Sequence, residues 1–202
     1  PPMEAGTYPA VCVGIVDLGE QYSETFKKYS DKLLVIWEIP SQTIEIDGED
    51  KPRWLSKDFS ASLNEKSNLY QTLVSWRGKA FTENELTEDE NGLMQFSVLD
   101  MLGTGCFLQV IVEEKDGNSY NRITSVISLP AGMSAPTTET PLIAFDMDAW
   151  DDEVFNSLPV WIQDRIKKST QYQKLHVPTD PVDVDTSGGQ NQEQAQKEEN
   201  PI

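Results

Sequence analysis

The sequence has little of what most catalytic and metal sites are built from. Its 202 residues include one histidine, His176, and two cysteines, Cys12 and Cys106. Two thiols and one imidazole fall short of the four ligands of a structural zinc site. His176 borders a polar segment that we expect to be disordered, so a Ser-His-Asp or Cys-His arrangement has no base. We therefore predict that the protein is not an enzyme.

Motifs for phosphate and metal binding are missing as well. No Gly-Lys-Ser/Thr follows GTGCFL, so that stretch is not a nucleotide-binding loop. The acids at Asp146, Asp148, Asp151 and Asp152 resemble a cation-binding loop, but they lack the glycine and glutamate that complete an EF-hand. The sequence thus predicts neither a metal nor a cofactor.

Long apolar runs are also absent. The densest apolar blocks are VCVGIV, LLVIWEI, FLQVIV and ITSVISL. They suffice for one core, yet each is far shorter than the roughly 18–20 residues of a membrane span. The first residues, PPMEAGTYPA, do not read as a secretory signal. We expect a cytoplasmic protein without membrane contact, whose two cysteines are buried free thiols.

Positive charge is scarce, with one exception. The chain has 16 Lys and Arg against 34 Asp and Glu, a net charge of −18 that disfavours nonspecific binding to DNA or anionic membranes. Residues 51–82 differ, because six cations face only two acids there and five aromatic residues lie among them. Cations interleaved with aromatics suit a single-stranded nucleic acid, which offers phosphates and flat bases. The alternative is an ordinary surface helix and hairpin.

Hydrophobic patterning predicts the element order β-β-β-α-β-β. Strands are expected at 7–19, 32–39, 43–60, 105–114 and 119–129, with a helix from Ser62 or Asn64 to Arg77. Pro40 is expected to end the second strand, and Gly78 to end the helix. This is the element order of an OB-fold, a small Greek-key barrel. Another mixed α+β arrangement of the same elements is the alternative.

Four regions follow from this pattern. Residues 1–130 form the barrel domain, 131–156 a linker and acidic segment, 157–175 a helix that packs on the barrel, and 176–202 a disordered acidic tail. The fold class is therefore mainly β, a five-stranded OB-fold-like barrel with a C-terminal helix. In such a barrel the first strand pairs with the fourth, which brings Cys12 and Cys106 into neighbouring strands.

Candidate nucleic-acid-binding residues come from the third strand, the end of the helix and the fifth strand. Alternation places Arg53, Lys57 and Phe59 on one face of the third strand and Trp54 on the other, and the ligand face is either of the two. The sequence leaves open whether Trp37, Trp76 and Tyr70 belong to the core or stack on bases. The full candidate set is Lys51, Arg53, Trp54, Lys57, Phe59, Trp76, Arg77, Lys79, Tyr120 and Arg122.

Five segments of the chain resemble those of a known protein family. They are AGTYPAVCVGIVDLG, LLVIWEIP, RWLSKDFSASLNEKSNL, LVSWRGKAFT and LGTGCFLQVIVEE. Together they resemble a family of small tailed-bacteriophage proteins, the OB-fold single-stranded DNA-binding proteins of phage replication and recombination modules. The resemblance covers about residues 5–130, and more loosely 157–175. It implies DNA binding in the host cytoplasm and carries no catalytic signature.

The resulting hypothesis is sequence-independent binding of single-stranded DNA. Replication or recombination proteins are further candidate partners, through an acidic tail that resembles the tail of bacterial single-strand binding proteins but ends Asn200-Pro201-Ile202 without their terminal aromatic residue. A homo-oligomer is compatible with the sequence. The rival hypothesis is an acidic protein-interaction or DNA-mimic module that binds no nucleic acid.

Overall fold

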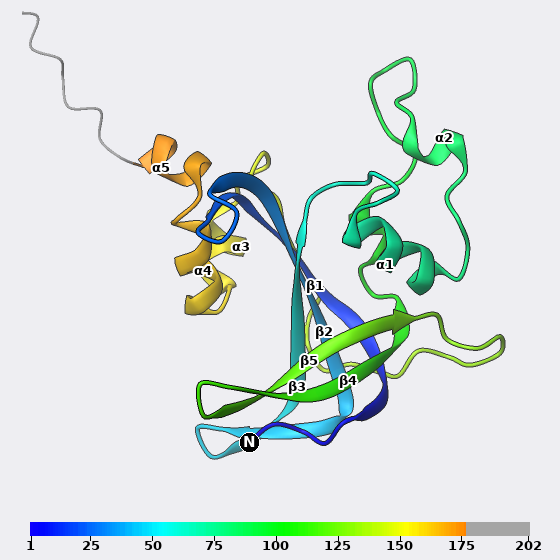
Figure 1. Cartoon of the computed structure of the whole chain (residues 1–202), viewed down its shortest axis with the longest axis vertical. Coiled ribbons are helices and arrows are strands. Elements are labelled where there is room, and N and C mark those ends of the chain that lie inside the picture. Colours follow the sequence, from blue (N-terminus) through cyan, green and yellow to red (C-terminus); the bar gives the residue numbers. More distant parts are fainter. Residues whose placement is uncertain (177–202) are drawn as a thin grey trace, which may run out of the picture.

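The computed structural model of the chain describes residues 1–176 (Figure 1). The predicted acidic tail lies outside these residues except for His176, which ends the last helix. The strands are β1 (Gly6–Ser23), β2 (Lys28–Ile46), β3 (Glu49–Ser60), β4 (Gly105–Lys115), β5 (Asn118–Ile127) and β6 (Ile143–Phe145). The helices are α1 (Asn68–Arg77), α2 (Glu83–Leu86), the 3-10 helix η1 (Val98–Met101), α3 (Asp152–Ser157), α4 (Val160–Ile166) and α5 (Thr170–His176).

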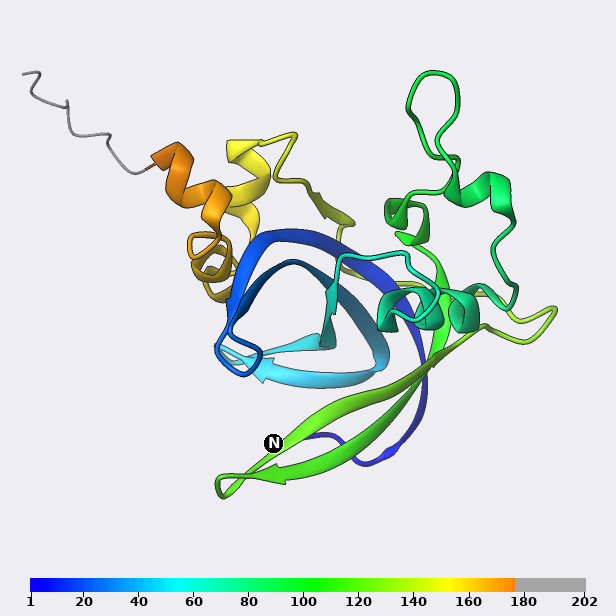
Figure 2. The same cartoon turned by 45° about the horizontal axis from the view of Figure 1, so that its top comes forward.

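Five strands form a nearly closed barrel in the order β3-β2-β1-β4-β5, as the OB-fold prediction requires (Figure 2). β1 belongs to both halves of the barrel because its first half pairs with β4 and its second half with β2. Two bulges, at Cys12/Gly14 and Asp17/Gly19, let this long strand bend. The predicted pairing of the first and fourth strands is confirmed, and Cys12 and Cys106 are buried free thiols.

The second strand is longer than the sequence predicted. Pro40 does not end it, because the register shifts between Ile39 and Thr43 and pairing with β3 resumes beyond the shift. Such a bulge accommodates a residue that has no N–H to donate. The Asp47-Gly48 turn is therefore the tip of the β2–β3 hairpin, with both residues at positive φ. Residues 43–46, predicted as the start of the third strand, belong to β2.

Helix α1 closes one end of the barrel. It begins later than predicted, since Ser67 rather than Ser62 or Asn64 caps it and accepts the N–H of Tyr70 at 3.1 Å. Gly78 ends it in the left-handed conformation at φ 69°, as predicted. Its buried side chains are Leu69, Leu73 and Trp76, and Ser75 donates to the carbonyl of Val126 in β5 at 2.7 Å.

The segment after residue 142 is more ordered than a linker followed by one helix. β6 pairs in parallel with β1, and α3 lies within the stretch predicted as linker. The predicted helix 157–175 is two helices, α4 and α5. Ser169, which is fully buried, accepts the N–H of Tyr172 at 3.1 Å, so α5 starts with a cap of its own.

Two apolar clusters hold these parts together. One fills the barrel and includes Trp37, Phe59 and Leu108. The other lies outside the barrel, where the outward side chains of β1 and β2 meet β6, α3 and α4; it includes Leu34, Ile36, Phe145, Ile162 and Ile166. The outer face of β1 and β2 is therefore covered by the chain's own C-terminal segment (Figures 1 and 2).

Candidate nucleic-acid interface

Strand register settles which way the residues of β3 face. Arg53, Leu55 and Lys57 stand opposite Ile39, Trp37 and Val35 of β2. Those three partners are buried in the barrel core, so Arg53 and Lys57 belong to the inner face of the sheet. Trp54, Ser56 and Asp58 belong to the outer face.

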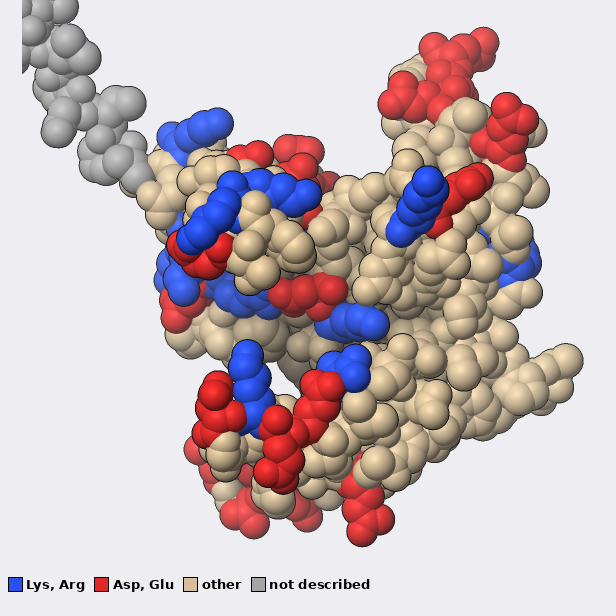
Figure 3. All heavy atoms as spheres, viewed as in Figure 1, with Lys and Arg blue, Asp and Glu red and all other residues tan. Residues whose placement is uncertain are grey.

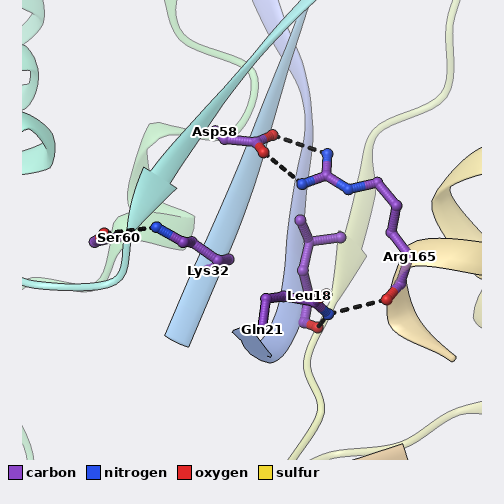
Figure 4. A network of polar contacts seen from close by, with 6 residues as sticks. All are labelled: Leu18, Gln21, Lys32, Asp58, Ser60 and Arg165. Atoms are coloured by element: carbon purple, nitrogen blue, oxygen red, sulfur yellow. Dashed lines mark hydrogen bonds and ion pairs between the residues drawn. The ribbon is translucent and has the colours of Figure 1, made fainter. Parts of the chain in front are cut away.

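The outer face of β3 is occupied. The Trp54 indole packs against the outer cluster and donates to the Thr140 hydroxyl at 2.9 Å. Asp58 forms a bidentate ion pair with Arg165 of α4, and the arginine Nη1 lies 2.9 Å from the Asp58 Oδ1 (Figure 4). The carbonyl of Arg165 in turn accepts from Gln21 at 2.9 Å. In many OB barrels this surface binds oligonucleotides. Here the C-terminal segment covers it over β1, β2 and Trp54.

A buried carboxylate fixes the segment that leads to this cover. Glu38 is fully buried on the outer side of β2. Its two carboxylate oxygens accept the backbone N–H groups of Glu139 at 2.9 Å and Thr140 at 3.0 Å. Charge-assisted bonds of this kind are strong, and they satisfy a carboxylate that would otherwise be costly to bury.

Two of the predicted stacking residues are core residues. Phe59 and Trp76 are each only 3% exposed. The Trp76 ring packs against Trp37, with ring centroids 5.4 Å apart, and its Nε1 donates to the carbonyl of Gly105 at 3.2 Å. Trp37 is fully buried. The apolar cost of exposing these rings keeps them inside the barrel, so they are not part of a binding surface.

The Arg77 side chain is also largely buried. Its guanidinium forms an ion pair with Glu85 and lies over the rings of Phe81, at 4.0 Å, and Phe96, at 5.1 Å. Arg77 therefore ties α1 to the α2 region instead of meeting a ligand. Tyr70 packs against Phe81. Lys79 is exposed beside a pocket of about 450 Å³ that also contains Gln95 and Asp100.

Apart from Lys51, the remaining cations of the candidate set lie where β3 and β5, the two end strands of the barrel, approach each other. Among the described residues these two strands form no ladder, and we call the gap between them the seam. The seam cations are Arg53, Lys57 and Arg122. Figure 3 shows Lys and Arg atoms together with some Asp and Glu atoms around a hollow in this face, and further Asp and Glu atoms on the projecting loops.

Lys57 is the most unusual of the seam cations. It is half-buried, its Nζ lies 5.5 Å from the centroid of the Phe59 ring, and no carboxylate pairs with it within residues 1–176. Burial lowers its pKa from the ordinary 10.5, and the positive charge of Arg122 lowers that pKa further. Lys57 is therefore a partly desolvated cation beside a second cation, an arrangement that costs free energy.

The other seam cations are partly engaged. Arg122 forms an ion pair with Glu113, with 2.6 Å between Nε and Oε1, and stays about half exposed. Arg53 donates from Nη2 to the carbonyl of Pro1 at 2.9 Å. Lys51 is exposed and paired with Glu49 close to the turn of the β2–β3 hairpin. Tyr120 is 52% exposed and is the only predicted aromatic candidate, within residues 1–176, that is free to stack.

Sequence reasoning missed three exposed aromatic residues of one hairpin. Tyr22, Phe26 and Tyr29 lie at the tip of the β1–β2 hairpin and are 44%, 72% and 56% exposed. The signal was present in the sequence, where YSETFKKYS holds three aromatic residues and two lysines within nine positions. It was hidden because the predicted strands stopped at 19 and restarted at 32.

Comparison with known proteins adds no family: no family model and no curated protein matches the chain. Residues 1–176 contain no cluster of three or more His, Cys, Asp or Glu side chains placed to hold a metal ion. Within the same range, none of the helices has the length and apolar character needed to cross a bilayer.

Proposed function

We propose that the protein binds single-stranded DNA without sequence preference and that the seam holds the phosphates. The observation that carries this proposal is Lys57, a half-buried lysine without a carboxylate partner in the described chain, placed near a second cation, Arg122. Like charges brought together and partly removed from water cost free energy. A phosphate between them would offset that cost and make use of both donors.

The barrel supports the same function. OB barrels recur as oligonucleotide binders, and the hairpin loops that flank their strands take part in binding. Here the ligand would lie along the seam and the β5 edge, because the C-terminal segment covers the outer face of β1 and β2. Arg53 and Lys57 would thus lie on the ligand side, one of the two arrangements that the strand alternation of β3 allowed, whereas Phe59 of that set is buried. The likeness to phage replication and recombination proteins supports the host cytoplasm as the place of action. It also supports replication or recombination proteins as partners that bind the acidic residues after 176.

Charge reversal at the seam tests the proposal. The variant Lys57→Glu/Arg122→Glu should lose most of its affinity for oligo-dT in a fluorescence-anisotropy titration, and its log–log salt slope should fall by about two. The matched control is Lys66→Glu/Lys168→Glu, which changes the net charge equally at two exposed lysines away from the seam. Lys57→Gln/Arg122→Gln removes the charges with less risk to folding, and circular dichroism checks each variant. Equal affinities of the seam and control variants would refute the proposal.

A second function, mimicry of DNA by an acidic surface, is favoured by one observation. Acidic side chains occupy the projecting β2–β3 hairpin and the loop around α2, as Figure 3 shows. Under this alternative the protein binds a basic partner and retains no oligonucleotide. Wild-type protein that fails to bind oligo-dT at low salt, yet displaces DNA from a basic protein, would establish the alternative.

A further inference from the structure

The β1–β2 hairpin carries an aromatic cluster that the core does not use. Tyr22 and Tyr29 stand directly opposite each other on the two strands, with ring centroids 5.0 Å apart. Phe26 lies in the turn and is 72% exposed, the largest exposed fraction among the exposed large apolar side chains of residues 1–176. Three aromatic rings in one exposed turn are costly to leave in water, which marks such a cluster as a contact surface.

Lysines surround these rings. Lys27 and Lys28 follow Phe26, with the Nζ of Lys28 6.0 Å from the centroid of the Phe26 ring, and Lys32 stands at the base of the hairpin. Lys27 pairs with Glu24 and adopts a left-handed backbone at φ 50°, which is uncommon for a residue other than glycine. In a chain of net charge −18, the paired hairpin of residues 19–32 carries three cations and three acids, so it is locally neutral. The hairpin therefore offers flat rings with lysines beside them.

The hairpin is held rigidly at its base. Gln21 bridges the carbonyls of Leu18, at 2.7 Å, and Arg165, at 2.9 Å (Figure 4). The N–H of Glu20 donates to Gln171 at 2.8 Å, and its carboxylate accepts from Thr170 at 2.7 Å. Helices α4 and α5 thus support the hairpin, and a rigid platform loses less entropy when a ligand binds.

Strand geometry relates the hairpin to the seam. Tyr29 and Val35 are six positions apart in β2, and the extra residue of the Asp17/Gly19 bulge lies in β1, so alternation along β2 places them on the same face. Val35 stands opposite Lys57. Six residues of strand span about 20 Å, which falls within the reach of a strand of a few nucleotides.

We infer that Tyr22, Phe26 and Tyr29 stack on unpaired nucleobases, and that this hairpin makes the protein select single-stranded over duplex DNA. This inference rests on the proposed function. The seam would contact only phosphates, which single strands and duplexes share, so it cannot distinguish the two. The hairpin rings need exposed base faces, which a duplex keeps stacked inside. The hairpin thus determines the selectivity for unpaired strands, and the phosphate contacts of the seam determine a large part of the salt dependence of binding.

Abasic DNA separates the two contributions. The probes are oligo-dT of about 15 nucleotides, a strand of equal length with abasic sugars at most positions, and a duplex of that length. Wild-type protein should bind oligo-dT about ten-fold or more tighter than the abasic strand, since stacking contributes per base. Phe26→Ala/Tyr29→Ala should bind oligo-dT and abasic DNA equally, with its abasic and duplex affinities and its salt slope unchanged.

Control variants make each outcome decisive. Leu93→Ala removes a comparably exposed apolar side chain from the α2 region and should leave discrimination intact. Phe26→Leu/Tyr29→Leu keeps apolar area without flat rings and should also lose discrimination. Lys57→Glu should weaken binding to both single strands equally. If Phe26→Ala/Tyr29→Ala still discriminates, the inference is overturned while the proposed function stands; if wild-type protein binds neither strand, both fall.

Discussion

Lys57 of β3 lies close enough to Arg122 of β5 for the positive charge of the arginine to lower the lysine's pKa. The two residues come from the end strands of the barrel, which approach without forming a ladder within residues 1–176. The open seam keeps two cations together at the surface, and the predictions below start from that arrangement.

Binding through Lys57 should depend on pH in the alkaline range. In the free protein its pKa lies below 10.5, and a bound phosphate would raise it again. Between the two values the complex holds more protons than the free protein, so affinity falls as pH rises through that window. Titrations with oligo-dA, whose bases do not ionise there, should show Lys57→Arg losing affinity at a higher pH than wild type. Identical pH profiles would contradict the role of Lys57.

Trp76 should matter for stability and not for binding. Because it packs against Trp37 in the barrel, Trp76→Ala should lower the free energy of unfolding by about 3–5 kcal/mol. Trp76→Phe should cost less and leave the affinity of the folded protein for oligo-dT unchanged. Denaturant unfolding and anisotropy titration measure the two effects. Loss of affinity in a fully folded Trp76→Phe variant would instead indicate that Trp76 stacks on a base.

Glu38 should be a structural carboxylate. Glu38→Gln keeps one acceptor but turns an amide donor toward the N–H of Glu139 or Thr140, so it should cost about 1–3 kcal/mol of stability. Glu45→Gln, an exposed position on the same strand, is the control and should stay within about 0.5 kcal/mol of wild type. Equal unfolding midpoints for the two variants would show that the buried contact contributes little.

The two cysteines should be inert in the native protein. Burial raises the pKa of the Cys12 thiol to about 12 and also raises the pKa of the Cys106 thiol. Since the thiolate is the reactive form, a thiol reagent at neutral pH should modify neither residue until the chain unfolds. Rapid labelling of one thiol in native protein would mean that β1 and β4 open at this point.

Much of the barrel could be predicted from the sequence. The Asp-Gly turns at 47–48 and 116–117 and the β-branched runs around them give local signals that decide strand pairing. The extension of β2 past Pro40 could not be predicted in this way, because the bulge depends on pairing with β3. The break between α4 and α5 depends likewise on Ser169 being buried near β1.

The candidate site was harder to predict, because composition does not show on which face of a strand each side chain lies. Trp54 and Lys57 are neighbours in sequence, yet one faces the C-terminal cover and the other the seam. Leu69, Leu73 and Trp76 do recur at helical spacing, so the burial of Trp76 could have been found by choosing that stripe. The ion pair of Arg77 with Glu85 joins two helices across a loop, and no local pattern indicates it.

The most direct measurement of the central claim is a titration of wild-type protein with oligo-dT at increasing salt. The account predicts retention at low salt, a linear fall of log affinity with log salt, and weaker binding of duplex DNA of the same length. Absence of binding at low salt, or equal affinity for duplex and single strand, would contradict it.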